Sequence, residues 1–238
     1  MTKRILLPLV LSSVAVVALA GCAPVYGFSG ARVSDDRDIE SVDSVEVRTD
    51  GDLSVTVGDT PSLRISAPQG IIDRLTSDVV DGVLVLGVQG PTFGFDFGRI
   101  TYELTVPELS SLSIEGSSDV TADFTGADVV LISIDGSGDV DGSGIDAQSV
   151  TTEVSGSGDI ELTGRTDEQV VDISGSADFG GEDLISRTTR VSLSGSGDIE
   201  VHATETLDAE ISGSGEVRYR GGAAVTSEVS GSGSVRED

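Results

Sequence analysis

Residues 150–162 read VTTEVSGSGDIEL, and the apolar residues of this stretch keep to alternate positions. Val150, Val154 and Ile160 share one parity with both glycines, whereas the serines and the acidic residues take the other parity. Side chains of a β-strand point to opposite faces in alternation, so this period of two indicates strands that bury one face. Glycine tolerates the dihedral angles of a bend and leaves room at a narrow corner. The stretch therefore predicts two strands joined by a tight passage at Gly-Ser-Gly.

The same pattern occurs seven times in the C-terminal half of the chain. Its copies begin at Ile114, Ile134, Val154, Ile173, Leu193, Ile211 and Val229. Successive copies are 18 to 20 residues apart, which is the signature of a solenoid. A low-complexity Gly/Ser linker is the alternative for such a composition. A linker would not hold apolar residues in phase on both sides of every motif.

Units of this length are too small to bury their own apolar faces, so they must share one core by stacking, with strands about 4.8 Å apart. We predict an all-β fold, a parallel β-helix or β-solenoid with about seven Gly-Ser-Gly coils over residues 110–238. Residues 41–109 carry further strand patterns without the motif, with Asp-Gly turns at 50–51 and 81–82. One short helix is expected at 71–75.

The first 21 residues have the form of a bacterial export signal. Lys3 and Arg4 give a positive start, and the apolar run that follows is too short to span a bilayer. The segment ends in Leu-Ala-Gly-Cys, which resembles the lipobox of bacterial lipoproteins, where the signal is cut before a cysteine that receives a diacylglyceryl group. We expect Cys22, the only cysteine, to become the lipid-bearing N-terminus. A plain secretory signal is the alternative.

Residues 22–40 contain Pro, Gly and Ser and then a polar stretch, a composition typical of extended and mobile linkers. We predict that they tether a domain of residues 41–238 to the membrane through the lipid on Cys22. The protein would then be extracytoplasmic and lipid-anchored to the bacterial cell membrane.

The charge balance excludes several classes of partner. The chain has 14 Lys and Arg against 41 Asp and Glu, and loss of Lys3 and Arg4 with the signal leaves 12 − 41 = −29. Such a polyanion is repelled by nucleic acids and by anionic lipid head groups, so we expect neutral or cationic partners. One Cys and one His exclude an internal disulfide and multi-Cys or His-rich metal sites.

A family resemblance emerges from the N-terminal strands. The sequence DLSVTVGD at residues 52–59 is followed by DGVLV at 81–85 and then by the Gly-Ser-Gly-Asp coils. This combination resembles the head GIN domain family of putative auto-transporter adhesins over residues 41–238. The resemblance implies an exported or lipid-anchored envelope protein with a right-handed β-helix-like fold. It brings no catalytic or ligand-binding residues, because none is established for the family.

Two outward rows run through the motifs. One row has an acidic residue in each of six coils, namely Asp119, Asp139, Asp159, Asp178, Asp198 and Glu216. The other row, a candidate binding face, consists of Ser117, Ser137, Ser157, Ser176, Ser196, Ser214 and Ser232. Carboxylates one coil apart repel each other by about 1 kcal/mol in water, so the acidic row has a reason to collect cations. Calcium needs six to eight oxygen ligands, so specific metal sites compete here with diffuse counter-ion binding and with a simple solvated face.

No catalytic set emerges from the sequence. A carbohydrate-active β-helix needs a matched carboxylate pair or a base in a cleft, and nothing singles out such a pair. His202 has outward parity, and we expect an exposed histidine rather than a general base. Phe93, Phe95 and Phe97 share one parity, and we expect a strand edge that buries them, with an exposed contact patch as the alternative.

Three functions remain open. We predict a non-enzyme without a cofactor, an adhesin-like binding or structural module that contacts an envelope glycan, a neighbouring cell or a protein partner. The alternatives are a carbohydrate-active β-helix enzyme and a cation-binding envelope component. The sequence does not fix the oligomeric state, although the charged residues 236–238 after the last coil would discourage end-to-end stacking.

Overall fold

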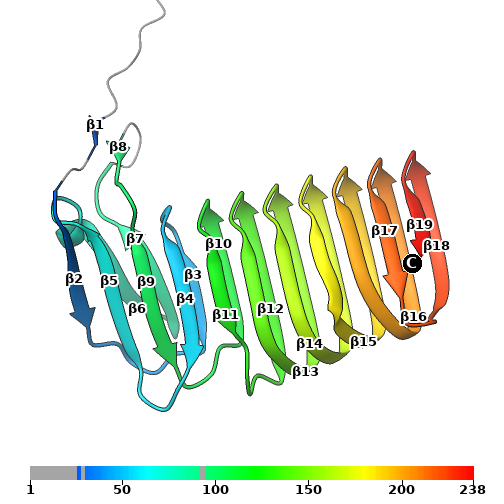
Figure 1. The fold of residues 1–238 in the computed structure, drawn as a ribbon, viewed down its shortest axis with the longest axis horizontal. Helices are drawn as coiled ribbons and strands as arrows, with labels where there is room; N and C mark the ends of the chain where they lie inside the picture. Colours follow the sequence, from blue (N-terminus) through cyan, green and yellow to red (C-terminus); the bar gives the residue numbers. More distant parts are fainter. Residues whose placement is uncertain (1–25, 28–29, 92–94) are drawn as a thin grey trace, which may run out of the picture.

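The computed structural model of the chain describes residues 26–27, 30–91 and 95–238. Strands account for 70% of the residues and form a β-solenoid whose coils stack along one axis (Figure 1). The predicted short helix is a single 3-10 turn, η1 (Ile72–Arg74). No helix among the described residues is long and apolar enough to cross a membrane.

Seventeen strands belong to the solenoid sheet. Those before the repeats are β2 (Arg32–Arg37), β3 (Ser44–Val47), β4 (Asp52–Val57), β5 (Ser62–Pro68), β6 (Leu75–Val80), β7 (Val83–Val88) and β9 (Thr101–Val106). Those of the repeats are β10 (Ser111–Gly116), β11 (Val120–Asp123), β12 (Val129–Gly136), β13 (Val140–Gly156), β14 (Ile160–Gly175), β15 (Phe179–Gly195), β16 (Asp198–Gly213), β17 (Glu216–Arg220), β18 (Ala224–Gly231) and β19 (Ser234–Glu237). A separate small sheet pairs β1 (Tyr26–Gly27) with β8 (Phe95–Asp96).

The predicted stacking of motif upon motif is confirmed. Val154 pairs with Ile134 on one side and with Ile173 on the other, in parallel strands. Gly156 likewise lies between the first glycines of its two neighbouring motifs. As far as Val217, the apolar side chains of the predicted inward parity are buried and form one continuous core along the stack, whereas Val225 and Val229 of the last coil are exposed.

The first glycine of each motif is required both for its backbone conformation and for the close contact between coils, and the sequence indicated only part of this. The first glycine of each motif has φ between +125° and +150°, where a side chain is strained. A Cβ on Gly156 would also collide with the carbonyl oxygen of Gly136 in the preceding coil, inside the 3.0 Å that real Cβ atoms keep. That carbonyl accepts a hydrogen bond of 2.9 Å from the N–H of Ser157. The coils are thus packed backbone on backbone at this corner.

The solenoid has about six turns, whereas the sequence analysis predicted about seven coils. The count of motifs was right, but the motif marks a corner of the coil. Seven corners, from Gly116 to Gly231, are joined by six intervening passages around the axis.

The strands before the repeats continue the same stack. β3 pairs in parallel with β10, and β4 with β11, so residues 44–57 form a further coil without the Gly-Ser-Gly motif. The buried Ser118 joins this coil to the first motif, because its hydroxyl donates to the Thr49 carbonyl and accepts from the N–H of Gly51 at 3.3 Å. One core therefore runs from the strands before the repeats into the repeats themselves.

The N-terminal end of the solenoid is closed by antiparallel strands. β5 pairs antiparallel with β9, and β2 pairs antiparallel with β5. Arg37 of β2 then reaches across the end of the core, donating to the Leu75 carbonyl at 2.8 Å and to the Ser77 hydroxyl at 3.2 Å. This arrangement corrects the prediction that residues 22–40 are all flexible tether. The charged residues of β2 resemble a solvated linker in sequence, but its backbone hydrogen bonds to β5 decide the structure.

Candidate binding face

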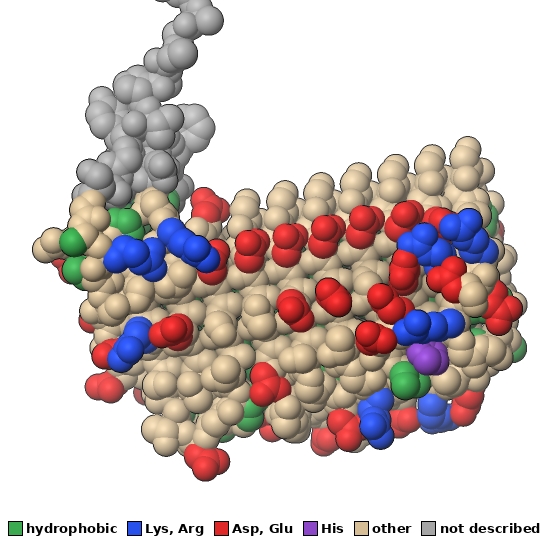
Figure 2. Space-filling view, viewed as in Figure 1, with side chains coloured by type: hydrophobic (Ala, Val, Ile, Leu, Met, Phe, Trp, Pro, Cys, Tyr) green, Lys and Arg blue, Asp and Glu red, His purple; other side chains and the backbone are tan. Residues whose placement is uncertain are grey.

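One face of the solenoid carries a long groove lined by acidic side chains, with a volume of about 610 Å³. Two columns of residues line it. The first column is the acidic row of the motifs, Asp119, Asp139, Asp159, Asp178 and Asp198, and the second contains Asp141, Glu161, Glu182 and Glu200. Arg218 lies at one end. We call this feature the acidic groove. Figure 2 shows the acidic side chains running along the solenoid axis.

The strand period explains why the two columns face solvent together. Asp159 and Glu161 flank Ile160, which points into the core and is buried. In the next coil, Phe179 pairs with Ile160 in register and is also buried, and it is flanked by Asp178 in the first column and by Gly180 in the second. Each coil therefore adds one position to each column, and these positions are spaced as the strands are.

The first column has a structural role that the sequence analysis missed. The N–H of Asp159 donates to the carboxylate of Asp139 at 2.9 Å, and the N–H of Asp198 donates to that of Asp178 at 2.8 Å. The same bond links Asp178 to Asp159 at 3.4 Å, and Glu216 to Asp198 at 3.2 Å. A short acidic side chain beside a tight turn commonly accepts backbone N–H groups. One Asp at the same motif position in successive coils was the signal for this role.

The predicted metal role of the acidic row gains no further support. Within the described ranges, no group of three or more His, Asp or Glu side chains is arranged to hold a metal ion. The carboxylates lie in a single file rather than in a cage. Glu216 at the end of the file bonds with Arg236 at 2.8 Å and lies 3.7 Å from Arg218. Cation binding by Asp119, Asp139, Asp159, Asp178, Asp198 and Glu216 stays a prediction.

The second column holds two carboxylates that are free to meet a ligand, and Asp119 at the start of the first column is a third among the described residues. Asp141 and Glu161 lie side by side in register, and neither carboxylate makes a hydrogen bond or ion pair to another described residue. Glu200 in the same column is paired with Arg218. Between Glu161 and Glu200, the position of this column is taken by Gly180, which has no side chain. The side chain of Glu182 extends over Gly180 instead. One Glu182 carboxylate oxygen is buried there without a partner in the described part of the chain.

The serine row lies along the edge of the same face, at the corner of each coil. Ser117, Ser137, Ser157, Ser176, Ser196, Ser214 and Ser232 are all exposed. From the second coil onward their N–H groups donate to glycine carbonyls of the preceding coil, at 2.8 to 2.9 Å. No hydroxyl of this row bonds to another described residue, so the structure presents a regular array of free hydroxyl groups.

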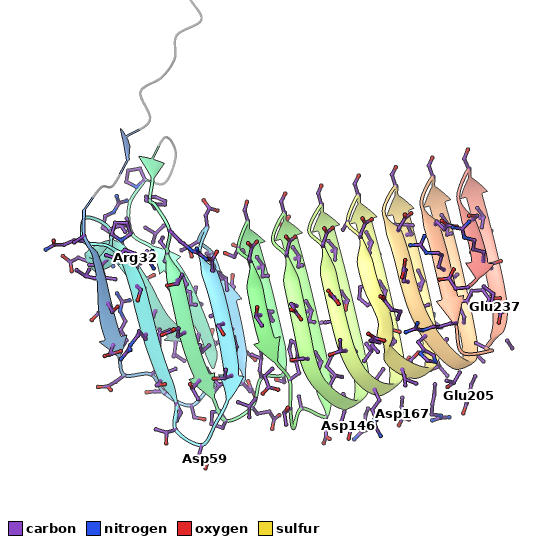
Figure 3. The ribbon with its side chains drawn as sticks, viewed as in Figure 1. Arg32, Asp59, Asp146, Asp167, Glu205 and Glu237 are labelled. Carbon is purple, nitrogen blue, oxygen red and sulfur yellow. The ribbon has the colours of Figure 1, made fainter. Side chains whose placement is uncertain are left out.

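Ion pairs elsewhere on the surface account for the shifted carboxyl pKa values. At the opposite corner of the coils, where Figure 3 labels Asp146, Asp167 and Glu205, Arg187 lies 3.0 Å from Glu205 and 3.5 Å from Asp167. The hydrogen bond from Arg187 lowers the pKa of Glu205 below its usual range. Arg64 does the same to the pKa of Asp36. These pairs are exposed, and such pairs contribute little to stability.

The remaining sequence candidates do not form a catalytic set. His202 is half-buried, and its Nδ1 lies 3.3 Å from the Glu182 carbonyl oxygen rather than near a carboxylate. Phe97 is buried, as predicted, and the Arg74 guanidinium lies 5.8 Å from the centre of its ring. Phe93 lies outside the described residues, as does the side chain of Phe95. Cys22 also lies outside them.

Residues 42–223 match the model of a family described as "Putative auto-transporter adhesin, head GIN domain". A putative adhesin from Bacteroides fragilis NCTC 9343 has a similar structure, with a TM-score of 0.84 and 24% identity, over 89% of this chain and 99% of that one. A putative adhesin from Parabacteroides distasonis ATCC 8503 gives a TM-score of 0.71 at 22% identity, over 90% and 99%.

A protein named a putative lipid binding protein, from the same Parabacteroides strain, gives a TM-score of 0.72 at 22% identity, over 89% of this chain and 98% of that one. No curated protein matches this chain. At these identities the solved structures establish the fold.

Proposed function

The chain belongs to the head GIN domain family of putative auto-transporter adhesins, and from this premise we propose that it is a lipid-anchored, non-catalytic adhesin-like module of the bacterial cell envelope. Its binding face is the acidic groove together with the serine row. The observation that carries the proposal is the pair of free carboxylates, Asp141 and Glu161, beside a regular array of free hydroxyls. Carboxylates and hydroxyls at a strand spacing suit a repetitive partner that is neutral or cationic, such as an envelope glycan.

The two alternatives fit the groove less well. A glycosidase needs two carboxyl groups that exchange protons at a defined separation. In the acidic groove, the carboxylates of Asp139, Asp159, Asp178 and Asp198 are engaged by backbone N–H groups of the following coil. The same bonds orient these carboxylates along the solenoid axis, which disfavours the convergent cage that a bound calcium ion requires.

Binding should depend on the second column of the groove. In a co-sedimentation assay with insoluble envelope polysaccharide and with whole bacterial cells, we expect Asp141→Asn combined with Glu161→Gln to weaken binding by about tenfold, the scale of one well-placed charge contact. The protein used is the chain from residue 22 onward with Cys22→Ser, which keeps every residue that the structure describes. Because Asp141 and Glu161 have no partners among the described residues, thermal stability should not fall.

The matched control removes the same charges from the other face. Glu153 and Asp172 are exposed, paired in register and absent from the lining of the groove, so Glu153→Gln with Asp172→Asn should leave binding unchanged. Equal losses of binding in both double variants would show that binding depends on the net charge of the protein and not on the groove. No sedimentation of the parent chain with either probe would contradict the binding role.

The lipid anchor is tested separately. We expect the full chain to be recovered in the membrane fraction, and Cys22→Ser to move it into the soluble fraction, because the thioether-linked lipid can form only on that thiol. Ala23→Ser is the matched control and should stay with the membrane. The mass of the N-terminal peptide reports the lipid directly. Retention of Cys22→Ser in the membrane fraction would show that another feature holds the protein there.

A further inference from the structure

The two ends of the solenoid differ in their exposed strand edges. At the C-terminal end, β18 pairs in register with β16, from Thr206 with Ala224 to Gly213 with Gly231. No strand of the described chain lies against its other edge. All eight residues of β18 are exposed, including Val225 and Val229, which have the inward parity of the core and are 37% and 41% exposed. In Figure 3, Glu237 lies at this end and Arg32 at the opposite one.

The N-terminal edge has the features that keep strand edges from pairing with other chains. β2 reads RVSDDR, so four of its six side chains are charged. β18 reads AVTSEVSG, with one charge and no proline. Natural edge strands are usually protected by charges, by proline or by a covering element. An edge that has a single charge, no proline and no covering strand among the described residues, and that exposes two valines, has the properties of an interface.

The sequence of β18 is complementary to itself. We propose that two copies of this protein associate tail to tail, by antiparallel pairing of β18 with β18 about a two-fold axis at Ser227. In this register Val225 faces Val229 of the second copy, and Thr226 faces Glu228 of the second copy. Ser227 faces its own equivalent. Apolar residues then meet on the core side, and no like charges are directly opposed.

Two features of the chain favour a second copy of the protein as the partner of β18. The solenoid sheet already contains antiparallel neighbours of this kind, because β5 runs antiparallel to β9 at the other end. The charge that would oppose stacking at the C-terminal end is partly neutralised, since Arg236 is paired with Glu216. Because one end is closed and one is open, the association ends at two copies instead of forming a filament. The strong net negative charge predicts that the dimer tightens as salt is added.

A cysteine on the proposed axis tests the geometry. In the chain from residue 22 onward with Cys22→Ser, Ser227→Cys supplies the sole thiol, and in the dimer it would face its copy at a Cβ separation of about 5 Å, within reach of a disulfide after a small adjustment. Under mild oxidation we expect most of Ser227→Cys to become a disulfide-linked dimer. Ser174→Cys, exposed on β14 in the middle of the solenoid, should stay largely monomeric.

A second measurement keeps the test independent of the disulfide. By sedimentation equilibrium, the parent chain should show a monomer–dimer equilibrium that Ser227→Glu weakens by about tenfold or more, because it places two carboxylates face to face. Ser174→Glu adds the same charge elsewhere and should have no such effect. Circular dichroism confirms that each variant is folded. A parent chain that is monomeric at every concentration, or equal cross-linking at positions 174 and 227, would overturn the proposal.

Discussion

Alanine at Gly156 should unfold or nearly unfold the solenoid, with a loss of about 3–5 kcal/mol in the free energy of unfolding. Two costs add at this position. Its φ of +147° is unfavourable for any residue with a side chain, and the new Cβ would collide with backbone atoms of Gly136. The neighbouring coil cannot yield, because its carbonyl is held by the N–H of Ser157. Denaturant unfolding followed by circular dichroism measures the loss.

Two control variants separate the costs. Gly222 has φ of +77°, and a Cβ added there would meet nothing within 4 Å, so Gly222→Ala should show the backbone strain alone, about 1 kcal/mol. Gly158→Ala has the collision without the unfavourable φ. Its cost should be intermediate, because the buried Ala177 occupies the equivalent place in the next coil. If Gly156→Ala costs no more than Gly222→Ala, the contact between coils does not limit stability.

Removing the ring of Phe179 should have the next largest effect. Phe179 is 1% exposed and lies in register between Ile160 and Ile199 in the core beneath the acidic groove. The ring fills the space beside Gly181, where a Cβ would collide with it. Phe179→Ala would leave a cavity, because the hydrogen bonds between neighbouring strands hold the surrounding backbone in place. We expect a loss of about 3–5 kcal/mol in the free energy of unfolding.

If the loss of stability in Phe179→Ala comes from a cavity, two further variants at this site should behave predictably. Phe179→Leu retains most of the buried volume and should cost less than half as much. Gly181→Ala in the background of Phe179→Ala should be tolerated better than Gly181→Ala alone, because the ring that excludes the methyl group is gone. Additive effects in this double-mutant cycle would show that the two residues are not coupled.

The sequence predicted the stack because the chain repeats its inward parity in every coil. Val154 and Ile160 could be assigned to the core, and their counterparts in the neighbouring coils with them, since a period of two leaves only two faces to choose between. The features that were missed depend on partners distant in sequence. Residues 32–37 have the composition of a linker, and their pairing with β5 makes them a strand. The absence of a side chain at Gly181 is explained only by the ring of Phe179, which fills the space beside it.

The alternation of apolar and polar residues could not predict the polar residues that lie inside the core. Thr152 and Gln169 are fully buried at inward positions. Gln169 accepts a hydrogen bond of 3.3 Å from Thr189 one coil further along, which no local pattern indicates. The candidate site was predictable to a similar extent. The acidic row and the serine row could be located by position. Only the structure could show that backbone N–H groups engage most carboxylates of the first column and leave those of Asp141 and Glu161 free.

The in-register pairing of successive coils gives this protein a modular length. Removing all residues between one corner and the equivalent corner of the next coil would join equivalent backbone positions, and would shorten the molecule by about 4.8 Å. Duplication of such a segment would lengthen it by the same step. Evolution can therefore adjust how far the molecule extends, and how many equivalent contacts it offers, in whole-number increments while the chemistry of each contact stays constant.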